Sequence, residues 1–273
     1  MENNRNRERT FVFFKFDGAG NDFVLIDARA CDPQFTTEQI AHICHRRFGV
    51  GADGLMTLGN GPEGYDFRMA YYNSDGREAE MCGNGGRCIA MFAHLMGLGR
   101  MEGGRKTLRF FATDGPHEAV VLDWDDRSGN GEVALSMRDV PNSEVKSVLD
   151  GHLLNTGVPH YVQEVVDLDH FDVVGEGRRL RHHPAMGPEG ANVNFVETQP
   201  DGSLKVRTYE RGVEDETWAC GTGVTACSIV TGCSSIQARG GRFRVDYLAT
   251  PEAFTRVVLT GPVSLNFDGS FSL

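Results

Sequence analysis

Short stretches of alternating apolar and polar residues predict that much of the chain forms β-strands. Such alternation places apolar side chains on one face of a strand, and turn-forming residues at 17–22 and 73–76 separate neighbouring stretches. The predicted strands lie within residues 11–16, 23–27, 67–72, 108–111, 118–124, 132–137, 157–162, 204–209 and 263–273.

Three other segments are predicted to be helical. Residues 36–48 carry apolar residues at helical intervals, and a glycine follows as a stop. The other two predicted helices begin directly after Cys82 and Cys220, and the first of them runs to Gly97. The chain is therefore expected to be a mixed α/β protein.

The two cysteine segments are similar to each other. Residues 81–85 read Met-Cys-Gly-Asn-Gly, and residues 219–223, 138 positions later, read Ala-Cys-Gly-Thr-Gly. In each half a strand, a loop, the cysteine, the glycine turn and a helix follow in the same order, and the loops differ by one residue. This repeated order predicts an ancient duplication with two halves of similar fold.

The composition is that of a globular protein with a substantial core: 273 residues, 40% hydrophobic and 24% charged. A formal net charge of -11 argues against a general nucleic-acid surface, which needs clustered Lys and Arg. The polar start is not a signal peptide, and no long apolar run suggests a membrane span. We therefore expect a cytoplasmic protein without nucleic-acid or membrane partners, whose seven cysteines are mostly reduced.

A cysteine at the start of a helix is expected to be reactive. Unpaired backbone N–H groups and the helix dipole favour the thiolate there, and can lower a thiol pKa from about 8.5 to roughly 3.5–7.5. The glycines after Cys82 and Cys220 leave backbone N–H groups accessible to an anion such as a carboxylate. Two thiols on either side of that carboxylate suit a racemisation, in which one thiolate removes an α-proton and the other thiol delivers one to the opposite face.

Other interpretations of the two cysteines are an inert buried pair, a disulfide between the halves, or a thiol–disulfide switch on an amino-acid-binding module. A metal site is disfavoured because the cysteine spacings lack the usual gap of about two to four residues, and His42, Cys44 and His45 do not complete a ligand set. Cys88 and Cys227, further along the two helices, are expected to be core residues.

Polar residues near the cysteines complete a candidate site for an amino acid. Glu210 and Arg211 end a strand before the second cysteine loop, and offer a zwitterion one partner of each sign. His160 begins a strand and is placed to tune a nearby thiol. Three asparagines lie in predicted turns, where Asn is also common for backbone reasons: Asn21, Asn73 and Asn192.

These segments resemble the diaminopimelate epimerase family over nearly the whole chain after residue 10. The Cys-Gly-Asn-Gly form of the first cysteine motif differs from the related proline racemases, which typically have His in place of Asn84. The resemblance rests on residues 18–23, 73–76, 81–88, 159–160, 192–195, 210–212 and 219–223, which occur in the family's order.

The resemblance implies interconversion of LL- and meso-diaminopimelate, in lysine and peptidoglycan-precursor synthesis, without pyridoxal phosphate, metal or another cofactor. It implies that Cys82 and Cys220 are the base and acid, and that His160 and Glu210 tune them. Another amino-acid racemase or isomerase of the same fold, such as a proline racemase, is the nearest alternative. The implied substrate contacts are Asn21, Asn73, Gly83, Asn84, Asn192, Glu210, Arg211, Gly221 and Thr222.

The implied fold has two pseudo-symmetric α/β domains, each a curved, mainly antiparallel sheet or barrel around a central helix. The expected N-terminal domain comprises residues 11–134 and 262–273, the C-terminal domain residues 135–261, and residues 1–10 form an arm. The oligomeric state is left open, with a homodimer as one alternative.

Three positions depart from the family pattern. Asp17 stands where His is common, Gly54 where some members contact the substrate through Gln, and Val158 where Asn commonly precedes Pro-His. Val158 is expected to matter most, because it removes a side-chain hydrogen bond to the distal end of the substrate.

Overall fold

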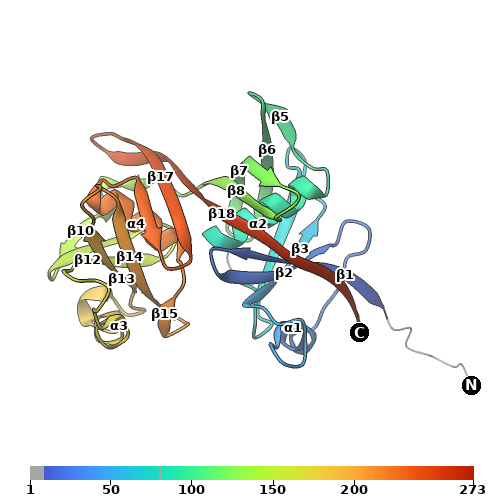
Figure 1. The fold of residues 1–273 in the computed structure, drawn as a ribbon, viewed down its shortest axis with the longest axis horizontal. Helices are drawn as coiled ribbons and strands as arrows, with labels where there is room; N and C mark the ends of the chain where they lie inside the picture. The colour runs from blue at the N-terminus through green and yellow to red at the C-terminus, as the bar shows by residue number, and fades with distance from the viewer. Residues whose placement is uncertain (1–8, 80–81) are drawn as a thin grey trace, which may run out of the picture.

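The computed structural model describes residues 9–79 and 82–273, which form two lobes joined by one long strand (Figure 1). The predicted arm up to residue 8, and Met81 of the first cysteine motif, lie outside the described residues. The first lobe contains β1 (Thr10–Gly18), β2 (Asn21–Asp27), α1 (Thr37–Cys44), β3 (Gly54–Gly59), β4 (Phe67–Asn73), α2 (Gly83–Leu95), β5 (Arg100–Glu102), β6 (Arg105–Ala112), β7 (Gly115–Asp125) and β8 (Asn130–Ser136). The second contains β9 (Val140–Pro141), β10 (Lys146–Val148), β11 (Gly151–Asn155), β12 (Pro159–Glu164), α3 (Val173–Arg181), β13 (Asn192–Thr198), β14 (Leu204–Glu210), β15 (Asp215–Thr217), α4 (Gly221–Thr231), β16 (Ser235–Ala238) and β17 (Gly241–Ala249), and β18 (Ala253–Ser272) runs through both lobes.

Eight strands of the first lobe form a closed ring around helix α2. Pairing runs through β1, β2, β3, β4, β6, β7, β8 and the later part of β18, which returns to β1. Helix α2 fills the interior, where Cys88, Ile89, Met91 and Phe92 are fully buried. A helix that is buried on all sides needs such an enclosure, and ring closure also leaves the barrel no open edge.

The second lobe repeats this topology around helix α4. In the first lobe β1–β2, β3–β4, β6–β7 and β7–β8 pair antiparallel, whereas β2–β3 and β4–β6 pair parallel. In the second lobe β11–β12, β13–β14, β16–β17 and β17–β18 pair antiparallel, whereas β12–β13 and β14–β16 pair parallel. The order of the pairings along the chain is the same in both. The register extends the match to single residues: Gly54 lies opposite Asn73 across β3 and β4, and the register of β13 and β14 sets Asn192 opposite Glu210. The predicted pseudo-symmetric fold, with a curved sheet around a central helix in each half, is confirmed.

The long strand β18 connects the lobes. It pairs with β17 up to Thr260 and with β8 from Gly261, and its final part pairs with β1. We propose the domain division suggested by the sequence, residues 11–134 with 262–273 and residues 135–261, and the change of partner after Thr260 supports a boundary there.

The first helix is shorter than the sequence pattern suggests. It begins as predicted, because Thr36 and Gln39 form a capping box. It ends at Cys44 rather than at residue 48, because the His45 ring accepts hydrogen bonds from the next backbone N–H groups, those of Arg47 and Phe48. These local bonds compete with continued helix.

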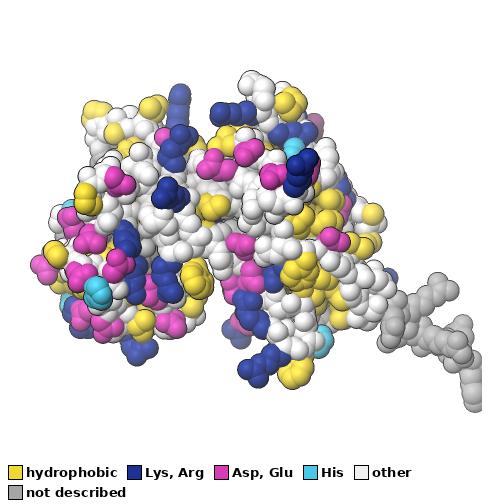
Figure 2. Space-filling model, viewed as in Figure 1, with side chains coloured by type: hydrophobic (Ala, Val, Ile, Leu, Met, Phe, Trp, Pro, Cys, Tyr) yellow, Lys and Arg dark blue, Asp and Glu magenta, His cyan; other side chains and the backbone are white. Residues whose placement is uncertain are grey.

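Basic and acidic side chains are intermixed over both lobes on the face shown in Figure 2. None of the helices in the described part of the chain has the length and apolar character needed to cross a membrane.

Candidate active site

Cys82 caps the first turn of the buried helix α2. Its backbone is extended, and its Sγ accepts a 3.2 Å hydrogen bond from Gly85 N. A Cβ at position 85 would meet the terminal methyl group of Met56, so a larger residue there would require the Met56 side chain to move. The N–H groups of Gly83 and Asn84 have no acceptor within the helix, so they are available to an anion.

Cys220 holds the same place at the start of helix α4. It is 8% exposed, and its Sγ lies 3.4 Å from Thr222 Oγ1, which hydrogen-bonds to His160 Nε2 at 2.8 Å. Asn194 accepts from Thr208 through Oδ1, so its Nδ2 is the group that donates to His160 Nδ1, at 3.1 Å. The neutral imidazole therefore carries its proton on Nε2 and donates it to the threonine hydroxyl.

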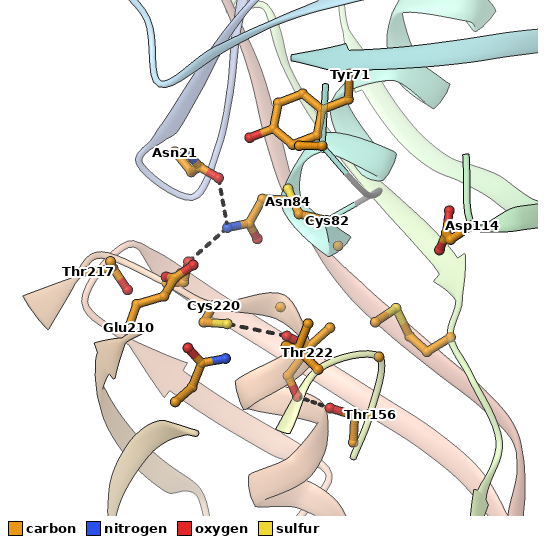
Figure 3. A pocket seen from close by; sticks show the side chains of 18 of the residues that line it. Asn21, Tyr71, Cys82, Asn84, Asp114, Thr156, Glu210, Thr217, Cys220 and Thr222 are labelled. Atoms are coloured by element: carbon orange, nitrogen blue, oxygen red, sulfur yellow. Dashed lines mark hydrogen bonds between the residues drawn. The ribbon is translucent and has the colours of Figure 1, made fainter. Parts of the chain in front are cut away.

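The two helix starts meet in a cleft between the lobes, with Cys82 and Cys220 on opposite sides (Figure 3). A Cβ on Gly221 would lie 3.2 Å from Gly83 Cα, so glycine at both positions lets the two N-termini converge. The cleft has a volume of about 1420 Å³, larger than the roughly 300–1,000 Å³ of a typical ligand pocket. A small substrate would therefore leave part of the cleft to water in this structure.

The predicted site residues converge on this cleft. His160 is the exception, because it is fully buried behind Thr222 and reaches Cys220 through that hydroxyl. All seven cysteines are free thiols in this structure, so no disulfide joins the two halves. The predicted catalytic and substrate-contact residues that line the cleft are Asn21, Asn73, Cys82, Gly83, Asn84, Asn192, Glu210, Arg211, Cys220, Gly221 and Thr222.

Asn84 joins the two lobes at the floor of the cleft. Its Nδ2 donates to the carbonyl oxygen of Ala219 at 2.8 Å and lies 3.5 Å from Asn21 Oδ1, and its Oδ1 accepts from Arg87 Nη2 at 3.0 Å. Asn21 in turn donates to Asp53 at 2.7 Å. These bonds fix the orientation of both amides and hold the residue before the second cysteine against helix α2.

Glu210 and Arg211 lie at the end of β14, beside Asn192. The Asn192 Oδ1 accepts from the backbone N of Arg211 at 2.7 Å, and the Arg211 side chain pairs with the exposed Glu189 at 3.2 Å. Burial raises the pKa of the Glu210 carboxyl. A carboxylate destabilised by burial gains most from a cationic ligand, so Glu210 is suited to an ammonium group.

The prediction that the helix starts lower both thiol pKa values is wrong for this structure. Burial raises the pKa of Cys82 to about 11, although the Gly85 N–H opposes it. Burial and the negative charge of Glu210 raise the pKa of Cys220 to about 12. The free energy needed to remove a thiolate from water is larger than the stabilisation that it gains from the helix N–H groups. Both thiols therefore need further positive charge in the cleft to ionise near neutral pH.

We expect His160 to make the protein less stable in acid. Burial, with the nearby charge of Arg211, lowers the pKa of His160 to about 3, whereas an unfolded histidine titrates at about 6.5. The stability contribution of the neutral ring is thus complete above pH 6.5 and is lost as the pH falls towards 3, because only the unfolded state binds the proton. Urea unfolding measures the free energy of unfolding of each protein at pH 7 and at pH 5. Between these two pH values the native protein should lose about 2 kcal/mol more of this free energy than the His160→Gln variant does. Equal losses would contradict the buried neutral ring.

Tyr71 and Thr156 are among the cleft residues that sequence reasoning did not find. The Tyr71 ring covers Gly54, on which a Cβ would lie 2.6 Å from the ring Cε2 atom. Thr156 donates to the carbonyl oxygen of Thr222 at 2.8 Å and so supports the second helix start. No motif marks either residue, because each has the sequence pattern of an ordinary strand or turn residue.

Comparison with known proteins decides the family. A family model described as diaminopimelate epimerase matches residues 13–138 and 152–252. The chain belongs to the diaminopimelate epimerase family. The diaminopimelate epimerase of Flavobacterium psychrophilum is 41% identical over 265 residues, which cover 93% of this chain and 98% of that protein. The diaminopimelate epimerase of Aquifex aeolicus is 39% identical over 286 residues, which cover 95% and 97% respectively.

Solved structures of other proteins share the fold. A probable proline racemase from Agrobacterium radiobacter matches with a TM-score of 0.69 and 15% identity, over 95% of this chain and 92% of that one. A hydroxyproline epimerase from Agrobacterium vitis matches with a TM-score of 0.66 and 14% identity, over 98% and 92%. At this identity the likeness concerns the fold alone.

The three departures from the usual diaminopimelate epimerase pattern have different surroundings. Asp17 accepts a 3.0 Å hydrogen bond from Gly20 N within its turn, and Gly54 is covered by the Tyr71 ring. Val158 lines the cleft. Of the three departures, Val158 is the one placed to touch a substrate.

Proposed function

We propose that this protein is a diaminopimelate epimerase that interconverts LL- and meso-diaminopimelate, with Cys82 and Cys220 as base and acid and without a cofactor. The observation that carries the proposal is the convergence of two cysteine-capped helix starts, from opposite lobes, on one cleft. The names of the relatives support the substrate. The product serves lysine and peptidoglycan-precursor synthesis.

The α-carboxylate of the substrate lies between the helix starts. There it accepts hydrogen bonds from the backbone N–H groups of Gly83, Asn84, Gly221 and Thr222, and both helix dipoles favour its charge. The α-carbon is then flanked by the two thiols. One thiolate removes the α-proton, the developing charge spreads into the carboxylate that the N–H groups stabilise, and the other thiol protonates the opposite face.

The substrate supplies the positive charge that the buried thiols lack. Glu210 raises the pKa of both Cys82 and Cys220. When the α-ammonium group pairs with Glu210, the two charges compensate each other, so the thiol pKa values fall in the complex. Arg211 provides a cation for a carboxylate. The thiolate thus forms where it is used, beside a bound zwitterion.

Product analysis tests the proposal. The protein is incubated under reducing conditions with LL-diaminopimelate, L-proline and trans-4-hydroxy-L-proline, and the products are separated by chiral chromatography. We expect meso-diaminopimelate and no inversion of the two imino acids. Inversion of proline without epimerisation of diaminopimelate would instead establish a different racemase, and binding of diaminopimelate without turnover would establish a binding module.

Val158→Asn is expected to lower KM for LL-diaminopimelate by about fivefold to tenfold. The asparagine restores a side-chain hydrogen-bonding group on the cleft wall, and one such bond contributes about 1 kcal/mol. Steady-state kinetics measure the change, with Val158→Ala as the control for side-chain size. An unchanged or higher KM would place the distal end of the substrate elsewhere in the cleft.

A further inference from the structure

The two halves of the duplicated site differ in charge at matched positions. Asn73 ends β4 and Glu210 ends β14, so a neutral amide in the first half corresponds to a carboxyl group in the second. Five residues after each cysteine, Arg87 in helix α2 corresponds to Thr225 in helix α4. At the matched helix position, the half with Cys82 therefore has a cation and the half with Cys220 has a hydroxyl group. At the matched strand end, the half with Cys82 has a neutral amide and the half with Cys220 has a carboxyl group.

Arg87 is fully buried beneath the first helix start. Its Nη1 donates to the carbonyl oxygen of Gly83 and its Nη2 to Asn84 Oδ1, both at 3.0 Å, while its guanidinium carbon lies 5.1 Å from the ring centre of Phe243. Burial lowers the pKa of Arg87 to about 10, so it remains a cation at neutral pH. Among the described residues no carboxylate acts on Arg87, and the positive charge of Arg87 lowers the pKa of Cys82.

Thr225 makes the equivalent hydrogen bond without the charge. Its Oγ1 donates to the carbonyl oxygen of Gly221 at 3.0 Å, as Arg87 donates to that of Gly83. Both carbonyls belong to the first residue of their helix. The hydrogen bond is therefore common to both halves, and the difference between them is the positive charge.

Hydrogen-bond donors lie beside both sulfur atoms, so they do not by themselves make the two thiols unequal. Cys82 Sγ accepts from a backbone N–H, which can only donate and therefore stabilises a thiolate. Cys220 Sγ lies beside the Thr222 hydroxyl, and the hydrogen bonds from Thr222 and from the Gly223 N–H both lower the pKa of Cys220. The charge of Arg87 lowers the pKa of Cys82, which favours ionisation of Cys82 before Cys220.

The other ionisable groups around the thiols do not reverse this order. Burial raises the pKa of Tyr71, which lies on the Cys82 side, so its hydroxyl stays protonated. Burial lowers the pKa of His160, behind Cys220, so its ring is neutral. Glu210 raises the pKa of both thiols, so its charge does not oppose the difference between them.

We propose that Arg87 is a positioning residue that makes the two thiols unequal, so that Cys82 is the thiol that loses its proton when the substrate binds, while Cys220 keeps its proton. The proposal rests on the proposed function, because it assigns the first step. Cys82 takes the α-proton of the epimer that it faces as that C–H bond breaks, and the S–H bond of Cys220 breaks as the new C–H bond forms. Cys220 then regains a proton from solvent, so that both cysteines are again thiols, as in the free enzyme.

Site-resolved alkylation tests the proposal without turnover. The protein reacts with iodoacetamide at pH 8, and peptide mass spectrometry gives the rates at Cys82 and Cys220. The Cys82 to Cys220 rate ratio is compared between variants, because the effect of each sulfur's accessibility on its rate is then the same on both sides of the comparison. Arg87→Met should lower the Cys82 to Cys220 ratio about tenfold, corresponding to about one pKa unit, and Arg87→Lys should restore most of it. Thr225→Val, which removes the matching hydrogen bond but no charge, should leave the ratio unchanged.

The native protein provides a test that needs no variant to fold. Because a thiolate is the nucleophile, each rate rises with pH and levels off near the thiol pKa. We expect the Cys82 rate to level off at a lower pH than the Cys220 rate. The same pH for both, or the reverse order, overturns the assignment, as does an Arg87→Met ratio equal to that of the native protein.

Separate epimerisation assays distinguish this inference from the proposed function. Normal epimerisation with no effect of Arg87 on the alkylation ratio overturns the role of Arg87 and leaves the proposed function standing. The expected alkylation pattern in a protein that does not epimerise diaminopimelate overturns the proposed function, and with it the assignment of the first step.

Discussion

Replacing either Cys82 or Cys220 with alanine is expected to abolish epimerisation and leave the fold intact. The two sulfurs lie on opposite sides of the cleft, so neither can protonate both faces of the α-carbon. A positioned acid or base contributes about 10²–10⁴-fold to a rate, and each substitution should cost at least that factor. Chiral chromatography measures the product, and thermal unfolding checks the fold.

Cys88→Ala and Cys227→Ala are the matched controls. These cysteines lie on the same two helices but are fully buried in the barrel interiors. Their substitution should reduce stability, because it leaves a small cavity, and should preserve activity. Full activity of either cleft variant, or loss of activity in the controls equal to that in the cleft variants, would refute the roles of Cys82 and Cys220.

Glu210→Gln is expected to have the second-largest effect, a fall of about 10–100-fold in kcat/KM for diaminopimelate. Glutamine keeps the shape of the side chain but removes the charge that pairs with the ammonium group, and a hydrogen bond to a charged group contributes about 1.5–3 kcal/mol. In the free enzyme the same change lowers the pKa of both thiols, because the Glu210 carboxylate raises them. Alkylation without substrate should therefore become faster while epimerisation becomes slower.

Glu189→Gln is the control for Glu210→Gln, since Glu189 is exposed and pairs with Arg211 at the edge of the site. It should change both rates by less than about fivefold, because an exposed ion pair contributes about 0–1 kcal/mol. If Glu210→Gln slows alkylation and epimerisation together, its carboxylate acts through the local structure rather than through its charge.

Local signals explain how much of the fold could be predicted. The helix starts at Cys82 and Cys220 stand out because glycines and an apolar run follow each of them. Strands β3 and β13 were missed because both of their faces are largely buried, which removes the alternation that marks a strand. Helix α3 was missed because Gly175 and Gly177 lower its apparent helix propensity. Closure of the first barrel by β18 depends on long-range pairing, which no local pattern reports.

The site was predicted in its membership but not in its electrostatics. Residue types, spacing and the family resemblance indicated a set of side chains for one site, and all of them except His160 line one cleft. The thiol pKa values were predicted in the wrong direction, because the desolvation of each cysteine depends on how the two lobes enclose it. Arg87 was not singled out, since arginine on a helix is usually exposed. Its burial depends on Phe243 and Gly261, on strands β17 and β18.

The fate of the α-hydrogen tests the two-thiol mechanism most directly. The native protein is incubated with LL-diaminopimelate in deuterated water, the reaction is stopped at low conversion, and mass spectrometry measures deuterium in the product and in the remaining substrate. Two opposed thiols predict one deuterium in each meso-diaminopimelate molecule from the first turnovers, and only hydrogen at the α-carbons of the unreacted substrate. A product that retains its original α-hydrogen would show that one base moves the same proton between faces, and would contradict the mechanism.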